Sequence, residues 1–445
     1  MDWQYLLSTT RLGLEDQNSV QREEDRSQFQ RDYDRIIFSA AFRRLQNKTQ
    51  VFPLPGKIFV HNRLTHTLEV ASVGRSLGHR LAEWLFQRNE ISNPAMISEI
   101  GSVVSAACLA HDLGNPPFGH SGESAIANYF LHGGGNHLKS ELSDAEWKDF
   151  TCFDGNANAF RLLTHAFAGK RKGGFALTYT TLSAIVKYPF ESTAATRQKL
   201  GFFQSEKNTW LHIAGELQLP QIDANPLQFA RHPLVYLVEA ADDICYQIMD
   251  VEDAFKLGIL SLEETKDLFM AFVGTQGTQV SRSIKETLQR VSDPHEQVSY
   301  LRAGTIGQLT QACFGVFTNR YSEIMEGRFN RSLLKEIPDD LRQAMQKVQS
   351  VSVSRVYNHR TVVEIEVAGY RILGTLMDEF IDAVLHPERP ASGKLLQLMP
   401  AQYHNTQPGV YAKVQTVVDF IAGMTDVYAL DLYRKIKGIS LPQIG

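Results

Sequence analysis

Apolar side chains recur at the spacing of an amphipathic helix in one segment of the chain after another. Two clear stripes are Leu64, Leu68, Ala71, Leu77, Leu81 and Leu85, and Leu237, Ala241, Ile244 and Ile248. Residues three or four apart share one face of an α-helix, so each stripe predicts a helix with one buried side. Strand-like alternation is rare, and its best candidate is residues 351–372, of which residues 362–365 also suit a helix. We therefore expect an all-α fold with at most a minor β element.

The composition is that of an ordinary globular protein. Of the 445 residues, 43% are apolar and 21% are charged, which supplies a large core and argues against a disordered chain. A formal net charge of −4 argues against a generally basic nucleic-acid-binding protein, so a polyanionic ligand has to meet locally placed positive charge. A weak break near residues 261–277 suggests a helical core over residues 1–260 and a C-terminal helical region over residues 261–445. One large helical domain fits equally well.

The N-terminal segment and the cysteines bear on the cellular location. Residues 1–17 carry acidic side chains and lack a basic flank followed by an apolar run, so they do not resemble a secretory signal. The four cysteines lie far apart without a CxxC pair, which argues against a disulfide framework and a thiolate zinc site. The most apolar run, near residues 100–110, is about half of the roughly 20 residues that span a bilayer. We expect a soluble protein in the reducing cytoplasm, with no membrane partner.

One segment combines several residue types that bear chemistry. In AACLAHDLGNPPFGHSGESAIANYF, residues 106–130, an apolar helix runs to His111 and Asp112 and is ended by Gly114 and two prolines. An imidazole and a carboxylate at the frayed end of a helix can converge on one ion. Taken alone, a His-Asp pair most often only terminates a helix.

Two other predicted helices carry polar residues on one face. Arg63 and His66 are three residues apart, and Asp242, Tyr246 and Asp250 follow one another at intervals of four. The residues that flank the second set are apolar and leave little of that helix for water. Buried carboxylates are unfavourable unless they meet cations or metals. The neighbouring Asp243 is an alternative to Asp242 but does not share the face of Tyr246 and Asp250.

The ordered set His66, His111-Asp112 and Asp242 resembles the H…HD…D signature of HD-domain metal phosphohydrolases. The string HDLGNPPFGHSGE is more specific and resembles the deoxyguanosine triphosphate triphosphohydrolase family. Six further strings support this resemblance and span most of the chain: residues 42–54 (FRRLQNKTQVFPL), 62–70 (NRLTHTLEV), 154–163 (DGNANAFRLL), 177–189 (LTYTTLSAIVKYP), 231–254 (RHPLVYLVEAADDICYQIMDVEDA) and 419–435 (DFIAGMTDVYALDLYRK). The resemblance implies the mostly helical HD-domain fold.

The resemblance also implies a metal site and a catalytic pair. One divalent ion would be held by His66, His111, Asp112 and Asp242, and manganese, magnesium and iron all suit such a set of nitrogen and oxygen ligands. His120 would be the catalytic acid or base and Glu123 the carboxylate that orients it. A simpler interpretation of these two residues is a loop histidine beside a glutamate that complements a helix dipole.

The implied reaction is the attack of water on the α phosphorus of a deoxynucleoside triphosphate, which gives the deoxynucleoside and tripolyphosphate. Arg63 is the first candidate for binding phosphate, Lys187 a second, and Tyr246 could reach phosphate or ribose. By family resemblance Gln46 and Asp250 contact the 3′ hydroxyl. Arg355, Tyr357 and His359 form a polar-aromatic cluster that could reach a nucleotide, although an exposed helix or strand surface is the simpler interpretation.

Two other functions are compatible with the sequence. The first is an HD-domain phosphohydrolase that acts on another nucleotide, and the second is a nucleotide sensor or single-stranded-DNA-binding protein with a vestigial metal site. The presence of all four ligands and of His120 disfavours the second. Relatives of this kind form ring-like oligomers, often hexamers, and the resemblance therefore implies a homo-oligomer.

Overall fold

The computed structural model describes residues 1–17, 26–52, 60–195, 198–404 and 408–440. Helices dominate these residues, and β1 (Gln221–Ala224) pairs with β2 (Leu227–Phe229) in one small antiparallel sheet. The expected all-α class with a minor β element is therefore confirmed. The helices up to residue 260 are α1 (Trp3–Leu6), α2 (Gln28–Ile37), α3 (Ala40–Arg44), α4 (Arg63–Gln87), α5 (Met96–Ala110), α6 (Gly119–His132), α7 (Asp144–Thr151), α8 (Gly155–Thr164), α9 (Tyr179–Ile185), α10 (Lys207–Glu216) and α11 (Val235–Lys256).

The C-terminal part is helical as well, including the segment that most resembled a strand. Its α-helices are α12 (Leu262–Val273), α13 (Thr278–Arg290), α14 (Pro294–Asn319), α15 (Tyr321–Met325), α16 (Asp339–Val351), α17 (Arg360–Leu385), α18 (Pro390–Leu396), α19 (Val410–Ala422) and α20 (Asp426–Ile436). The strand expected within residues 351–372 is wrong, because a π-helix over Ser352–Tyr357 leads into α17. Burial along α17 recurs at helical spacing, and packing of that face outweighs the strand preference of its β-branched residues.

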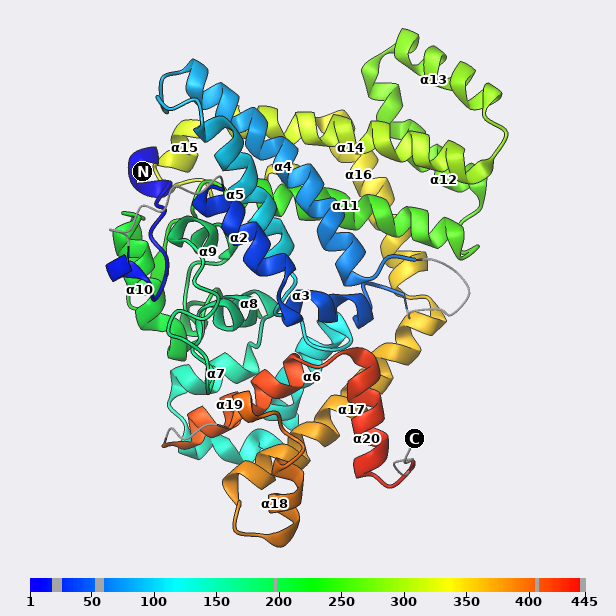
Figure 1. Ribbon diagram of the computed structural model, residues 1–445. Helices are drawn as coiled ribbons and strands as arrows, with labels where there is room; N and C mark the ends of the chain where they lie inside the picture. The colour runs from blue at the N-terminus through cyan, green and yellow to red at the C-terminus, as the bar shows by residue number, and fades with distance from the viewer. Residues whose placement is uncertain (18–25, 53–59, 196–197, 405–407, 441–445) are drawn as a thin grey trace.

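Two clusters of buried apolar side chains fill the molecule, and neither ends at residue 260. The first draws on residues from Trp3 to Val362, and the second on residues from Ala125 to Leu432. Helices α12, α14 and α16 contribute to the first core, whereas α6 and α7 join α17, α19 and α20 in the second (Figure 1). The expected boundary near residue 260 therefore does not coincide with a division of the hydrophobic core.

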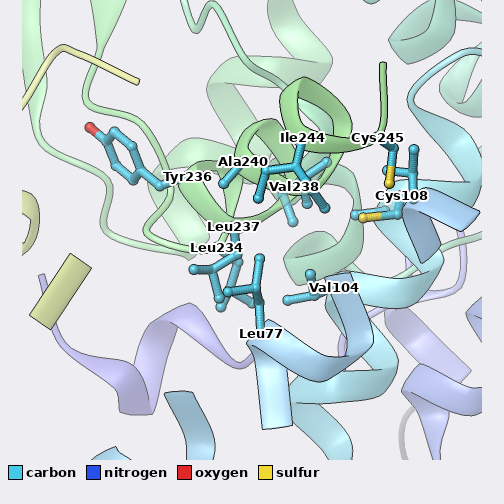
Figure 2. Close-up of a cluster of buried hydrophobic side chains, with 14 of the residues drawn as sticks. Leu77, Val104, Cys108, Leu234, Tyr236, Leu237, Val238, Ala240, Ile244 and Cys245 are labelled. Carbon is cyan, nitrogen blue, oxygen red and sulfur yellow. The ribbon is translucent and has the colours of Figure 1, made fainter. Parts of the chain in front are cut away.

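Helices α4, α5 and α11 form the centre of the first core. Figure 2 shows Leu77 of α4, Val104 of α5 and Leu237 of α11 in one buried cluster. Small residues let α4 and α5 approach closely, since a Cβ placed on Gly78 would lie 3.0 Å from the Cα of Gly101. The four candidate metal ligands lie in the first turn of α4, directly after α5 and within α11, so close packing of the apolar faces of these helices fixes where the ligands meet.

The start of α4 and the loop after α5 are set by local interactions. The Asn62 side chain accepts a hydrogen bond from the Thr65 amide, and the Thr65 hydroxyl accepts one from the Asn62 amide, so a capping box fixes the first turn of α4. After α5 the chain turns at Gly114, where the loop lies directly against α8. A Cβ there would come within 2.1 Å of the Gly155 carbonyl oxygen and of the Ala159 amide nitrogen. Within the described residues, no helix has both the length and the apolar character needed to cross a bilayer.

We expect Gly114→Ala to destabilise the fold, because its methyl group would force the loop and α8 apart. The expected loss in the free energy of unfolding is about 1–3 kcal/mol, the usual effect of overpacking, measured by urea denaturation. Gly304→Ala in α14 is the matched control, since a Cβ at Gly304 meets no atom of the described residues within 4 Å. That control should be neutral or stabilising. Equal denaturation midpoints for the two variants would contradict the close approach.

Candidate metal and phosphohydrolase site

The structure brings the four candidate metal ligands together from three helices. His66 lies in the first turn of α4, His111 and Asp112 directly follow α5, and Asp242 lies in α11. Both imidazoles face one carboxylate, since Oδ1 of Asp242 is 3.2 Å from Nε2 of His66 and 3.4 Å from Nε2 of His111. Nε2 of His111 is also 3.6 Å from Oδ1 of Asp112. Ligand atoms of His66, His111 and Asp112 all lie within 4.8 Å of one another, which is close enough to share one ion.

The hydrogen bonding of His111 suits a metal ligand. Its Nδ1 lies 2.6 Å from the backbone oxygen of Cys108, and because a carbonyl only accepts, Nδ1 carries the proton. The other nitrogen, Nε2, points into the cluster. Burial lowers the pKa of this ring, but the charges of Asp112 and Asp242 outweigh burial and raise it to about 9, so Nε2 has a free lone pair only when the ring is neutral. Nε2 is buried and has no hydrogen-bond partner among the described residues. A second hydrogen bond that fixes the tautomer in this way is typical of metal-binding histidines.

The carboxylates of the cluster are held in their ionised form. Burial raises the pKa of Asp242, but the nearby His111 and His66 outweigh burial and bring it well below its usual value. Burial also raises the pKa of Asp112, but the charge of Arg63 outweighs burial and brings this pKa below its usual value. Nη1 of Arg63 is 2.7 Å from Oδ2 of Asp112, and the side-chain amide of Asn115 donates a hydrogen bond to Oδ1 of the same carboxylate. Two ionised carboxylates with two imidazoles form a ligand set for a hard or borderline divalent ion.

The two candidate catalytic residues lie beside this cluster, at the start of α6. His120 is exposed at the wall of a cavity, and its pKa is lowered by surrounding protein atoms and by the charges of Arg63 and Lys199. Glu123 is buried and its pKa is raised by burial. Its Oε1 accepts a hydrogen bond of 2.8 Å from the Gly155 amide, and its Oε2 is 4.0 Å from Nζ of Lys199. The orienting role of Glu123 toward His120 stays a prediction.

A cavity of about 260 Å³ joins the metal cluster to these residues. Among the expected site residues its walls contain His111, Asp112, Asp242, His120, Glu123, Arg63, Lys187 and Tyr246. Other side chains on its walls were not singled out from the sequence as site residues, notably Gln50, Asn115, Asn156, Tyr188 and Lys199. Arg63, Lys187 and Lys199 thus place positive charge beside the carboxylates. A protein with a net negative charge needs such local positive charge to bind an anionic ligand.

The two lysines on the cavity wall, Lys187 and Lys199, have different carboxylate neighbours and different exposure. Lys187 lies 3.3 Å from Glu239, and its pKa is raised because the charges of Glu239 and Asp243 outweigh burial. Burial raises the pKa of Asp243 to about 7. Lys199 has a third of its side chain exposed and lies 3.7 Å from Asp154. Sequence spacing gave no signal for Lys199, because the fold alone brings it beside Glu123.

Gln46, expected near the 3′ hydroxyl, is not among the residues that line this cavity in the described structure. It belongs to the 3-10 turn Leu45–Asn47, its side chain is exposed, and it does not line the cavity formed by the described residues. Gln50, four residues later in the same string, lines the cavity instead. The Oε1 atom of Gln50 is buried and has no hydrogen-bond partner among the described residues. Periodicity could not separate the two glutamines, because the irregular residues 48–52 that follow the 3-10 turn decide which one turns inward.

Asp250 is buried one turn beyond Tyr246 and pairs with a residue from the C-terminal part. The Tyr357 hydroxyl donates a hydrogen bond of 2.7 Å to Oδ2 of Asp250, and its ring stacks on Tyr246 with centroids 5.9 Å apart. Burial raises the pKa of Asp250 to about 8. Of the polar-aromatic cluster noted in the sequence, Tyr357 meets these residues, whereas the exposed Arg355 pairs with Glu264. The stacking follows from tertiary packing, so spacing could not predict it.

Comparisons with known proteins agree with this site. The HD domain matches residues 63–161, which contain three of the four ligands, and a phosphohydrolase-associated domain matches residues 336–435. The chain is 38% identical to a "Deoxyguanosinetriphosphate triphosphohydrolase-like protein" of Synechocystis sp. and to one of Pseudomonas aeruginosa, over 99% of this chain and 100% of each relative. It is 31% identical to the "Deoxyguanosinetriphosphate triphosphohydrolase" of Yersinia enterocolitica, over 90% of this chain and 92% of that protein. The chain therefore belongs to the deoxyguanosinetriphosphate triphosphohydrolase family of HD-domain phosphohydrolases.

Proposed function

We propose that the protein is a metal-dependent deoxynucleoside triphosphate triphosphohydrolase with dGTP as a substrate. Water attacks the α phosphorus, the bond from phosphorus to the 5′ oxygen breaks, and deoxyguanosine and tripolyphosphate leave. The observation that carries this proposal is the buried Nε2 of His111, which has no hydrogen-bond partner among the described residues and faces the carboxylates of Asp112 and Asp242 in a cavity that also holds His120 and three cationic side chains. The names of the relatives support the choice of nucleotide.

His66, His111, Asp112 and Asp242 would hold the divalent ion. When bound there, such an ion supplies Lewis-acid polarisation of a phosphoryl oxygen. Arg63, whose guanidinium is held by Asp112 on the wall of the same cavity, would bind the phosphate. The side chains thus present positive charge where negative charge develops in the transition state.

His120 is proposed to give a proton to the departing 5′ oxygen. Its lowered pKa in the free protein reflects surrounding protein atoms and two nearby cations. A bound triphosphate brings negative charge to the same cavity, which raises the pKa of the imidazole and favours its protonated form. Glu123, whose carboxyl lies one turn further along α6, would stabilise that form.

The sugar is proposed to lie toward Tyr246, with Asp250 and Tyr357 at the 3′ hydroxyl. The Tyr357 hydroxyl already donates to Asp250, so one oxygen of this carboxyl is engaged and the other can meet the sugar. Gln50, whose buried oxygen has no hydrogen-bond partner in the described parts of the chain, is proposed to take the role expected for Gln46. The triphosphate would extend toward Lys187 and Lys199. A homo-oligomer, single-stranded DNA binding and a cytoplasmic location stay predictions from the resemblance.

The products test the position of cleavage. With Mn²⁺ or Mg²⁺, the purified protein should convert dGTP to deoxyguanosine and tripolyphosphate in equal amounts, measured by ion-exchange chromatography of the phosphates and reversed-phase separation of the nucleosides. The other three deoxynucleotides and GTP establish the preference for base and sugar. Release of pyrophosphate or single phosphate as the primary product would reject attack at the α phosphorus.

Substitutions separate the ligands from the proton donor. Asp242→Ala should lose both bound metal and activity, because it removes the carboxylate that faces both imidazoles. His120→Ala should keep the metal and lower turnover by about a hundredfold or more, the usual contribution of general acid catalysis. Asp243→Asn is the matched control for the metal content, because its carboxyl faces Lys187. Metal content is measured by mass spectrometry. Full turnover in His120→Ala would disprove the assigned acid.

A further inference from the structure

The loop that joins Asp112 to α6 is held by residues far away in the chain. Nζ of Lys48 donates hydrogen bonds to the backbone oxygen of Asn115, at 2.5 Å, and to that of Ala422 at the end of α19, at 2.9 Å. The carboxylate of Asp426, at the start of α20, accepts from the Phe118 amide at 3.0 Å. Its other oxygen accepts from the Thr49 amide at 2.8 Å. Two side chains thus tie this loop to the C-terminal helices.

Phe118 has a backbone conformation that needs such support. Its φ of 65° and ψ of 16° lie in the left-handed region, which a bulky residue rarely adopts. Conformations of this kind persist where the surroundings over-determine them. The Phe118 side chain packs on Gly369 of α17, where an added Cβ would lie 3.2 Å from three of its atoms. The Asp426 carboxylate and the α17 surface therefore hold the strained residue from two sides.

This conformation sets the direction of α6, which begins at the next residue. His120 is the second residue of that helix, so a change at Phe118 moves its imidazole relative to the metal ligands. At the other end of the loop, the Asn115 side chain bonds to Asp112. The positions of both ends of the loop therefore depend on whether the C-terminal helices are packed against it.

We infer that Asp426, together with Lys48 and Gly369, positions His120, so the geometry of the site is complete only with α17, α19 and α20 in place. Asp426 touches no reacting group and acts through the backbone of Phe118. The inference rests on the proposed function of His120. It gives the C-terminal region, matched by the phosphohydrolase-associated domain, an indirect part in turnover through the position of His120.

A purely structural role would have a different signature, and the chain offers a matched control for it. Asp419, in α19, is also buried, and its carboxylate accepts from Nε and Nη2 of Arg161, at 2.7 Å each. That ion pair joins α19 to α8 and does not reach residues 115–118. Asp419→Asn therefore weakens the attachment of the same region without removing a bond to the loop.

The experiment compares Asp426→Ala and Asp426→Asn with Asp419→Asn and the unaltered protein, at a temperature where thermal melts show each to be folded. For Asp426→Ala we expect kcat for dGTP to fall about tenfold or more, the effect of a misplaced catalytic group, while KM and bound Mn²⁺ stay close to the unaltered values. The kcat of Asp426→Asn, which keeps one acceptor oxygen, should lie between those of Asp426→Ala and the unaltered protein. Asp419→Asn should melt at a lower temperature yet keep its kcat. A kcat for Asp426→Ala that matches Asp419→Asn overturns the inference.

Hydrogen exchange tests the inference without catalysis. Backbone amides of residues 118–121 should exchange faster in Asp426→Ala than in the unaltered protein and in Asp419→Asn. If the unaltered protein hydrolyses no nucleotide, the proposed function fails while this measurement still decides whether Asp426 holds the loop. If exchange at these residues is unchanged, the inference fails and the proposed function stands. Should Asp426→Ala not fold, Asp426→Asn carries both comparisons.

Discussion

The site depends on the convergence of two imidazoles from separate helices on one carboxylate oxygen of a third. Oδ1 of Asp242 lies within 3.4 Å of both His66 and His111, and this is achieved only because α4, α5 and α11 pack closely through their apolar faces. The backbone oxygen of Cys108 completes the arrangement by fixing the tautomer of His111. The two carboxylates stay ionised in spite of burial, because the imidazoles of His111 and His66 lower the pKa of Asp242 and the charge of Arg63 lowers that of Asp112.

A net acidic protein has to concentrate positive charge to bind a polyanion. It does so here with cations that already have carboxylate neighbours, such as Arg63 beside Asp112 and Lys187 beside Glu239. The pairing keeps these side chains oriented before any ligand arrives, which reduces the reorganisation that binding requires. Asp243, which the sequence offered as an alternative to Asp242, has its pKa raised to about 7 by burial and lies near Lys187.

Sequence reasoning predicted the parts of this molecule that depend on local pattern. Helical periodicity gave the fold class, and spacing by four placed Asp242, Tyr246 and Asp250 on one face of α11. Resemblance, not spacing, selected the four ligands as a set. What remained beyond the sequence depends on irregular backbone or tertiary packing. Gln50 turns inward after a 3-10 turn while Gln46 does not, Lys199 meets Glu123 across the fold, and Tyr357 reaches Asp250 from a π-helix. The strand expected near residue 360 is absent from the structure, because packing of the buried face of α17 outweighs the weak β preference of its residues.

The sharing of both hydrophobic cores between the two halves of the chain has a consequence for biosynthesis. Every proposed metal ligand has left the ribosome once α11 emerges, so the centre of the first core can begin to assemble while nearly half of the polypeptide is still being translated. Helix α6 is made early but packs against helices that are made last. A nascent chain can therefore bring its proposed ligands together before the segment that carries His120 acquires its final support.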